Sequence, residues 1–335
     1  MSYRGAKVLV TGADGFIGSH LTEMLVEHGA SVTALALYNS FDQHGWIDDL
    51  PEPVRRGCEV VRGDIRDAAF VRPLVQGRDV VFHLAALIAI PYSYVAARSY
   101  VDTNVGGTLN LLEAARDFGV GRFVQTSTSE VYGTAITMPI AETHPLQGQS
   151  PYSASKIGAD MMAEAFARSF GMPVAILRPF NAFGPRQSER AVIPSVIRQA
   201  IDPACEVLSV GDTSTIRDFT YVEDTARAFL AIGDAPDIAY GQPYNAGSGV
   251  AVTIDDVIAA VRDVTGCTKP LRHDPARARP DRSEVRALLA ESRRLHEASG
   301  WTPRVSLAEG LRRTVDWWQL RCARGAMRRE TRFIA

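Results

Sequence analysis

The chain has 335 residues and a formal net charge of -2, with 46% hydrophobic and 22% charged residues. This composition is that of an ordinary globular protein, and the length holds one large core or two smaller ones. The small net charge excludes a strong field for nucleic acid or an anionic membrane, and no apolar run reaches the length of a membrane span. Neither partner is therefore expected.

The cysteines argue against a metal centre or a disulfide framework. The chain has four, spread along the sequence without a CxxC pair or a histidine-rich neighbour. The N-terminus runs directly into a strand pattern rather than into a signal peptide. Together these features predict a reducing, cytoplasmic setting and no metal ion.

The chain opens with a strand, a glycine turn, a helix and a second strand. Residues 6–11 are a short β-branched apolar run, residues 19–28 have helical periodicity, and residues 31–37 form the next apolar run. The turn has the Gly-x-x-Gly-x-x-Gly spacing of a dinucleotide fingerprint, and the helix start directs backbone amides at a pyrophosphate. The residues of this turn that we expect at the cofactor are Gly12, Gly15, Phe16, Ile17 and Gly18.

The end of the second strand bears on the choice between NAD and NADP. An acidic residue is expected there for a ribose 2′-hydroxyl and an arginine for a 2′-phosphate, and the sequence has neither. Asn39 and Ser40 can hydrogen-bond either group. NAD is favoured because no cation awaits the extra phosphate, while NADP stays open.

Further strands are predicted at residues 59–62 and 79–83. Asp64 and Ile65 follow the first of them, where an adenine ring lies in such folds, although Asp64 could instead cap the helix that starts near Asp67. The remaining positions expected at the cofactor are the small residues after the next strand and an asparagine on the following helix, namely Leu84, Ala85, Ala86 and Asn104.

The next elements carry candidate catalytic residues. Residues 100–118 have the pattern of a long helix, and residues 123–127 form a fifth strand. Thr128 and Glu130 follow that strand at its carboxyl end, the edge where open α/β sheets bind ligands. His83, at the end of the fourth strand, is interpreted as a packed histidine rather than a catalyst.

Tyr152 and Lys156 form the second part of this candidate site. They are spaced i, i+4 on a helix that begins at Pro151, so both side chains lie on one face. A phenol has a pKa of about 10, and a phenolate near neutral pH needs a drop of roughly 3 units, or about 4 kcal/mol. A nearby ammonium acts in that direction, so we expect Lys156 to lower the pKa of Tyr152, as a bound nicotinamide cation would.

The alternation of strands and helices loosens after a sixth strand at residues 174–177. The pattern predicts an α/β fold, a Rossmann-type doubly wound parallel sheet with a smaller α/β substrate-binding lobe. We expect residues 1–180 to form the dinucleotide-binding domain and residues 181–335 the substrate-binding lobe. The two are interleaved, because the region near residues 218–248 is expected to return to the sheet.

Together these motifs resemble the extended short-chain dehydrogenases/reductases that act on nucleotide sugars. Beside the glycine turn and the Tyr152/Lys156 pair, the resemblance rests on residues 82–86, 178–186 and 217–224, and it covers nearly the whole chain. The Thr-Ser-Glu run that ends at Glu130 resembles the Thr-x-Glu of nucleotide-sugar 4,6-dehydratases. The stretches that are similar to dehydratases of nucleotide-linked N-acetylglucosamine are residues 37–41, 86–94, 145–152 and 187–194.

The resemblance implies a lyase that makes a 4-keto-6-deoxy sugar nucleotide from UDP- or GDP-N-acetylglucosamine. Tyr152, with Lys156, would take the proton of the sugar 4-hydroxyl while C4 gives its hydride to the nicotinamide, and Thr128 would hydrogen-bond the same oxygen. The ketone acidifies the C5 proton, which Glu130 would remove as water leaves from C6. The hydride would then return to C6.

One position departs from part of this group. Some dTDP-glucose dehydratases have aspartate before the glutamate, where this chain has Ser129, as GDP-mannose-type dehydratases do. Serine is a poor general acid, so a dTDP-glucose substrate is disfavoured and Glu130 is expected to shuttle the proton itself.

The resemblance also implies the substrate contacts and the assembly. Arginine suits bidentate contact with a diphosphate, and Asn181 and Arg217 are the favoured positions. The long helix and the catalytic helix are expected to form the four-helix interface of a homodimer. The full set of candidate substrate contacts is Thr128, Asn181, Arg186, Arg190, Arg217 and Arg279.

Three alternative functions stay open. A UDP-glucuronate decarboxylase shares the Thr-Ser-Glu run and the oxidation at C4. A nucleotide-sugar 4-epimerase would leave Glu130 as a bystander. A non-catalytic dinucleotide-sensing protein would keep the fold, but it has no use for a base beside C5.

Overall fold

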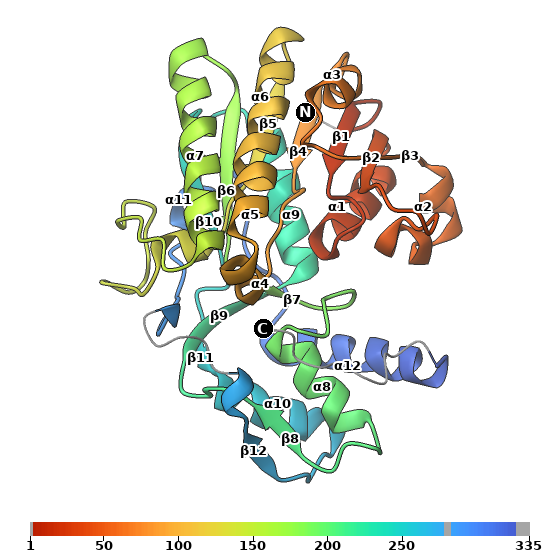
Figure 1. Cartoon of the computed structure of the whole chain (residues 1–335), viewed down its shortest axis with the longest axis vertical. Coiled ribbons are helices and arrows are strands. Elements are labelled where there is room, and N and C mark those ends of the chain that lie inside the picture. Colours follow the sequence, from red (N-terminus) through yellow and green to blue (C-terminus); the bar gives the residue numbers. More distant parts are fainter. Residues whose placement is uncertain (1–2, 278–282, 326–335) are drawn as a thin grey trace.

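A computed structural model of the protein describes residues 3–277 and 283–325. Its centre is a seven-stranded parallel sheet with the strand order β10-β6-β5-β4-β1-β2-β3 (Figure 1). The strands are β1 (Lys7–Thr11), β2 (Ser31–Leu37), β3 (Cys58–Gly63), β4 (Val80–His83), β5 (Arg122–Thr126), β6 (Val174–Pro179) and β10 (Pro243–Ala246). The predicted Rossmann-type fold is therefore confirmed.

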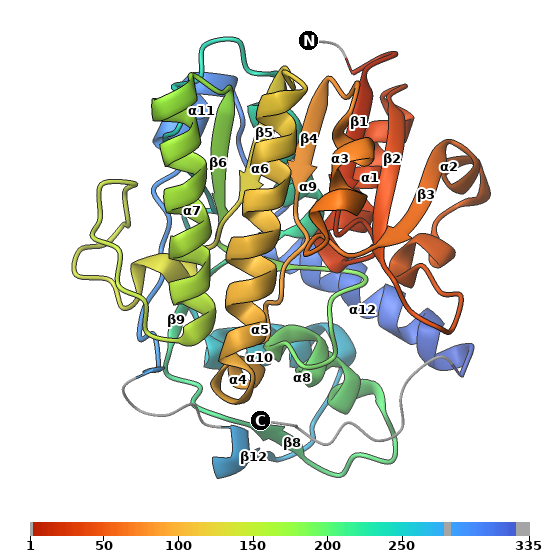
Figure 2. The same ribbon diagram turned by 45° about the horizontal axis from the view of Figure 1, so that its top comes forward.

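Helices cover both faces of this sheet, so its central strands are buried and read as continuous apolar runs. One face packs against α1 (Phe16–Glu27), α9 (Val222–Asp234) and α11 (Arg293–Ser299), and the other against α3 (Ala68–Val75), α6 (Gly107–Asp117) and α7 (Pro151–Phe170). Figure 2 shows α6 and α7 side by side over their face of the sheet.

A smaller lobe lies beyond the carboxyl ends of the main strands, below the sheet in Figure 1. It has a three-stranded sheet in the order β11-β9-β7 and a two-stranded sheet of β12 and β8. Its elements are β7 (Asn181–Phe183), α8 (Val192–Ile201), β8 (Leu208–Val210), β9 (Ile216–Tyr221), β11 (Ala251–Thr253), α10 (Ile254–Thr265), β12 (Leu271–His273) and α12 (Leu307–Ala323). An apolar cluster of its own, which includes Phe183, Ile197 and Trp318, forms the core of this lobe.

The boundary between the two parts follows no single point in the sequence. α9 and β10 come after the lobe strand β9, yet both pack in the main sheet layer. The division at residue 180, with the region near 218–248 returning, stays a prediction.

The helix predicted over residues 100–118 is not regular. α5 (Ala97–Tyr100) and α6 are joined by a π-helical turn, Val101–Gly106. Such turns widen a helix locally and commonly lie at functional sites. Here the turn presents Asn104 to the loop after β4 and to α7.

The start of α7 is fixed by its cap. The Ser150 hydroxyl accepts the N–H of Ser153, and the Ser153 hydroxyl accepts the N–H of Ser150 in return. Pro151 occupies the first turn as predicted, and Gly171 ends the helix in the left-handed conformation. This reciprocal cap holds the turn that carries Tyr152.

The remaining short elements lie in loops of the two parts. They are 3-10 turns at Gly45–Asp49, Ser129–Tyr132 and Pro275–Arg277, and the helices α2 (Glu52–Arg56) and α4 (Ile90–Val95). Within the described ranges no helix is long and apolar enough to cross a membrane. The same residues contain no group of His, Cys, Asp or Glu side chains that could hold a metal ion.

Candidate active site

The glycine turn lies at the carboxyl end of β1, beside the end of β4. Gly12 has a φ of +68°, and a Cβ there would lie 2.7 Å from the backbone nitrogen of Ala85. A Cβ on Gly18 would lie 2.1 Å from the carbonyl oxygen of Gly12, so α1 packs on the turn at a distance that only glycine permits. Gly15 is the N-cap of α1 and no side chain caps the helix, so the first-turn amides of Phe16 and Ile17 have no side-chain cap, and their contact with a cofactor stays a prediction.

The loop after β2 is organised by Asn39. Its side-chain amide donates to the carbonyls of Leu37 (3.3 Å) and Gln43 (2.8 Å), and its oxygen accepts the N–H of Phe41 (3.0 Å). Ser40 is exposed in the same loop. The structure thus gives Asn39 a role in shaping the loop, and a contact with the cofactor ribose stays a prediction.

Asp64 and Ile65 lie at the end of β3 as expected. The Asp64 carboxylate is paired with the Arg66 guanidinium, which holds the pKa of that carboxyl below its usual range. Asp67 itself caps α3 by accepting the N–H groups of Ala69 (3.0 Å) and Phe70 (3.2 Å). The alternative role of Asp64 as that cap is therefore wrong.

Asn104 joins three elements behind the predicted cofactor position. Its amide nitrogen donates to the Leu87 carbonyl and to the Ser155 hydroxyl, both at 2.9 Å, and its oxygen accepts the N–H of Leu87 (2.8 Å). The side chain thus fixes the loop that contains Leu84, Ala85 and Ala86 against α7. A direct contact with the cofactor stays a prediction.

His83 is a buried, neutral histidine. One ring nitrogen lies 2.8 Å from the Thr11 hydroxyl and the other 3.0 Å from that of Thr108. Burial, with a smaller effect of the Lys156 charge, lowers the pKa of His83 to about 3. The interpretation as a packed histidine is confirmed.

The four predicted catalytic residues lie together at the carboxyl end of β5. Thr128 is the N-cap of the 3-10 turn that carries Glu130, and its hydroxyl accepts the N–H of Glu130 (3.2 Å). The Thr128 side chain and the Glu130 charge both act on the pKa of the Tyr152 phenol. Lys156 donates to the Thr126 carbonyl at 2.5 Å.

The predicted effect of Lys156 on Tyr152 is not found. Burial is the dominant influence and raises the pKa of the Tyr152 phenol, the Thr128 side chain opposes this rise, and the Glu130 charge adds to it. Burial likewise lowers the pKa of Lys156 to about 8. The reason is that Tyr152 is only 7% exposed, so the loss of solvation dominates its pKa.

The predicted substrate-contact residues have different partners in the structure. Arg217 is buried at the substrate lobe and pairs with Glu284 at 3.1 Å. Arg186 instead pairs with Glu23 of α1 at 2.7 Å. Asn181 has a buried side-chain oxygen with no hydrogen-bond partner in the structure, which suits a ligand donor.

Two further predicted arginines have less structural support. Arg190 is exposed, and its charge acts on the Tyr100 phenol near the active site. Arg279 lies outside the described residues.

Sequence reasoning missed two polar groups at this site. Asp160 is fully buried one turn after Lys156 and pairs with Arg178 at 3.0 Å. The i, i+4 spacing that singled out Lys156 also singles out Asp160, so a signal was present. Glu284 offered none, because its partner Arg217 lies 67 positions away in the sequence.

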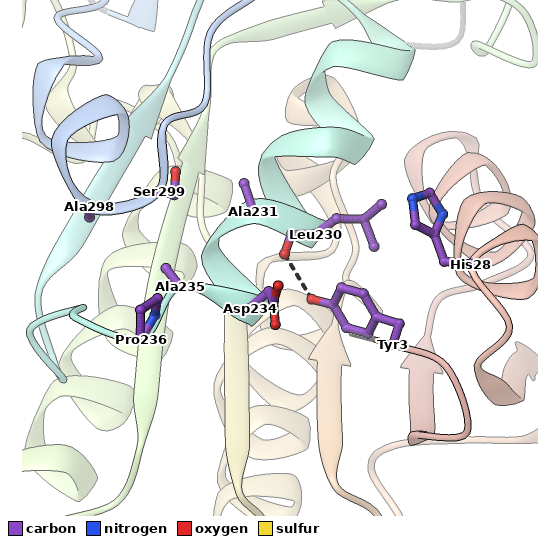
Figure 3. Close-up of a pocket in the computed structure, with 9 residues that line it drawn as sticks. All are labelled: Tyr3, His28, Leu230, Ala231, Asp234, Ala235, Pro236, Ala298 and Ser299. Carbon is purple, nitrogen blue, oxygen red and sulfur yellow. Dashed lines mark hydrogen bonds between the residues drawn. The ribbon is translucent and has the colours of Figure 1, made fainter. Parts of the chain in front are cut away.

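A hollow lies at the opposite, amino-terminal edge of the sheet. It is bordered by Tyr3, just before β1, and by Ala235, just after α9 (Figure 3). The Tyr3 hydroxyl donates to the Leu230 carbonyl at 2.8 Å. Its lining contains none of the predicted site residues, so it stands apart from the cluster at the carboxyl ends.

Comparisons with known proteins agree with this geometry. The family model described as GDP-mannose 4,6 dehydratase matches residues 9–314. The low-salt glycan biosynthesis protein Agl12 of Haloferax volcanii is 36% identical over 314 residues, which is 93% of this chain and 98% of that protein.

Two solved structures have nearly the same fold. The epimerase Mth375 from Methanothermobacter thermautotrophicus has a TM-score of 0.86 and 32% identity, and the match covers 96% of this chain and 94% of that one. DesIV, a dTDP-glucose 4,6-dehydratase from Streptomyces venezuelae solved with NAD and TYD bound, has a TM-score of 0.82 and 30% identity, covering 95% and 98%.

The match to one family model runs through both the sheet and the substrate lobe, and the curated and structural relatives cover nearly the whole chain. The relatives include both dehydratases and epimerases of nucleotide sugars. The chain therefore belongs to the GDP-mannose 4,6-dehydratase family of extended short-chain dehydrogenases/reductases, and it is an enzyme with nucleotide-sugar 4,6-dehydratase or 4-epimerase activity.

Proposed function

We propose that the protein is an NAD-dependent nucleotide-sugar 4,6-dehydratase that acts on UDP- or GDP-N-acetylglucosamine. The position of Glu130 is the observation that favours dehydration over the alternative reactions. Its charge acts to raise the pKa of the Tyr152 phenol, and Thr128, the N-cap of the same turn, acts on that phenol too. Elimination requires a second base that can reach the proton on C5, next to the carbon that is oxidised, and epimerisation does not.

The residues around the glycine turn fit a dinucleotide. Gly12 and Gly18 stand where a Cβ would collide with backbone, so the turn packs closely on β4 and α1, and no side chain caps the start of α1. Gly12, Gly15, Phe16, Ile17 and Gly18 would hold the pyrophosphate. NAD is inferred because DesIV, of similar fold, is described with NAD bound. When bound, NAD accepts a hydride from the sugar and later returns it.

The chain's own residues supply the proton transfers. Tyr152 would act as the phenolate, which the positive charge of a bound nicotinamide favours, and would take the proton of the sugar 4-hydroxyl, while Thr128 orients that oxygen. The C4 ketone then acidifies the C5 proton, Glu130 removes it, and the C6 hydroxyl leaves as water with a proton that Glu130 returns. A proton is restored at C5 when the hydride reaches C6, so the product is a 4-keto-6-deoxy sugar nucleotide.

Three features support the remaining parts of this proposal. Arg217 offers a cation to the substrate diphosphate, and the unpartnered oxygen of Asn181 can accept a hydrogen bond from a hydroxyl or N–H group of the substrate. Ser129 is buried, and a serine there disfavours dTDP-glucose, whose dehydratases can have aspartate at this position. Val101 and Met161, on the π-helical turn and on α7, are exposed apolar side chains, which suits a four-helix homodimer interface.

A product assay tests the function. The purified protein is incubated separately with UDP-N-acetylglucosamine, GDP-N-acetylglucosamine, GDP-mannose, dTDP-glucose and UDP-glucuronate, and each product is weighed. Loss of 18 Da (about the mass of one water) from an N-acetylglucosamine nucleotide is expected. Unchanged mass with altered NMR couplings would establish the 4-epimerase instead, and loss of carbon dioxide from UDP-glucuronate would establish the decarboxylase.

The glycine turn gives a prediction for cofactor binding. Gly18→Ala places a Cβ against the Gly12 carbonyl and must push α1 away from the turn. NAD binding is expected to weaken by at least about 10-fold, or about 1.4 kcal/mol, in a fluorescence titration with NADH. Gly106→Ala is the matched control, since a Cβ there meets only one atom at 3.9 Å and NADH affinity should be unchanged. Equal affinity in both variants would remove the turn from the cofactor site.

A further inference from the structure

Asp160 shares one helical face with the predicted catalytic pair. It lies on α7 two turns after Tyr152 and one turn after Lys156, and it is fully buried. The proposed reaction gives it no role. A buried carboxylate is costly unless it is paired and hydrogen-bonded, so its partners indicate what it does.

One oxygen of Asp160 accepts three hydrogen bonds from residues at the ends of neighbouring strands. It accepts the Ser127 hydroxyl at 2.7 Å and two nitrogens of the Arg178 guanidinium at 3.0 and 3.2 Å. Ser127 follows β5 and directly precedes Thr128, and Arg178 lies near the end of β6. The carboxylate therefore ties the catalytic helix to the strand end from which Thr128 projects.

Arg178 of this ion pair also contacts the last residue of the 3-10 turn Ser129–Tyr132, here called the catalytic turn. Arg178 donates to the Tyr132 hydroxyl at 2.9 Å and stacks over its ring, with 5.0 Å between the guanidinium carbon and the ring centre. The Tyr132 hydroxyl donates in turn to Asn245 of β10 at 2.7 Å. Tyr132 is the last residue of the turn that carries Glu130.

The segment from Ser127 to Tyr132 is thus anchored at both ends to one buried ion pair, and Thr128 and Glu130 lie between the anchors. We propose that Asp160, through Arg178, is a positioning residue that holds Thr128 and Glu130 in place relative to Tyr152 on α7. This inference rests on the proposed function. Small misplacements of catalytic groups cost rate far more than binding, since a shift of about 1 Å can cost about 100-fold.

Ser127→Ala and Asp160→Asn test this role. Ser127→Ala removes one hydrogen bond to the ion pair and leaves every charge in place, so it is the variant expected to fold normally. It should lower kcat about 10-fold, and Asp160→Asn about 100-fold, while KM for the nucleotide sugar stays within about 2-fold. The rate of C4 oxidation, followed by NADH absorbance in a single turnover, should fall in parallel with kcat.

The matched control is Asp224→Asn. Asp224 is an equally buried aspartate that pairs with Arg227 and accepts the N–H groups of Arg304 and Val305, away from the catalytic turn. The Asp224→Asn variant should be less stable than the wild type but should show no selective loss of kcat. An unchanged kcat in folded Ser127→Ala, or equal losses of kcat in Ser127→Ala and the control, would overturn the positioning role.

The design separates this inference from the function on which it rests. C4 oxidation is shared by dehydration and epimerisation, so the positioning role is measured even if the wild type proves to be an epimerase. Absence of NADH formation by the wild type with every nucleotide sugar would overturn both. Normal oxidation in the wild type and in both Ser127→Ala and Asp160→Asn would overturn the positioning role alone.

Discussion

Tyr152→Phe is expected to stop the first hydride transfer. In the proposed mechanism Tyr152, as the phenolate, takes the proton of the sugar 4-hydroxyl, and the Thr128 side chain acts on the same group. General acid–base groups contribute about 10²–10⁴-fold to rate, so kcat should fall by at least about 1,000-fold. The fall should appear as missing NADH absorbance in a single turnover, because the step that is lost precedes elimination.

Tyr100→Phe is the matched control for that variant. The Tyr100 ring lies 6.3 Å from that of Tyr152, and its hydroxyl donates to the Ala89 carbonyl rather than toward Thr128. Loss of this hydrogen bond costs about 1 kcal/mol of stability and should leave kcat within a few-fold. Equal losses of activity in the two variants would show that the pocket, and not the Tyr152 proton, limits the reaction.

Glu130→Gln is expected to separate oxidation from elimination. Glutamine keeps the size of the side chain but cannot remove the C5 proton, so NADH absorbance should appear and persist while release of water falls by about 10²–10⁴-fold. Product mass and absorbance are read on the same sample. Dehydration at the wild-type rate would remove Glu130 from the mechanism and leave the epimerase as the better description.

A nearby carboxylate offers the control for Glu130→Gln. Glu142 is almost buried and accepts the backbone N–H of Asn245 at 2.8 Å, so it is held by the structure rather than by the substrate. Glu142→Gln should lower stability and leave the ratio of oxidation to elimination unchanged. A persistent NADH signal in this variant too would mean that any loss of negative charge near the turn slows elimination.

The parts of the fold that follow from short-range sequence patterns could be predicted. The spacing of the glycine turn predicts it, because Gly12 and Gly18 occupy positions that a Cβ cannot enter. Pro151 at the helix start and the one-turn spacing of Tyr152 and Lys156 likewise predict α7. Local chemistry and periodicity suffice for such features.

Features that depend on burial or on distant partners could not be predicted. The pKa of Tyr152 is raised because the fold encloses it, and spacing alone says nothing about enclosure. Arg186, which the sequence predicts at the substrate, pairs with Glu23 of α1. The two positions are 163 apart in the sequence, so no local pattern predicts the pair. The π-helical turn at Val101–Gly106 could not be predicted, because its sequence has the same periodicity as a regular α-helix.

The central claim, that Glu130 makes this enzyme act at C5, is tested most directly by turnover in deuterium oxide. The wild type is incubated with UDP- or GDP-N-acetylglucosamine in D₂O, and the product is read by mass and NMR. Dehydration requires a solvent proton at C5, so the account predicts a 4-keto-6-deoxy product with one deuterium at C5. A product of unchanged mass, with hydrogen retained at C5 and inverted C4, would contradict it.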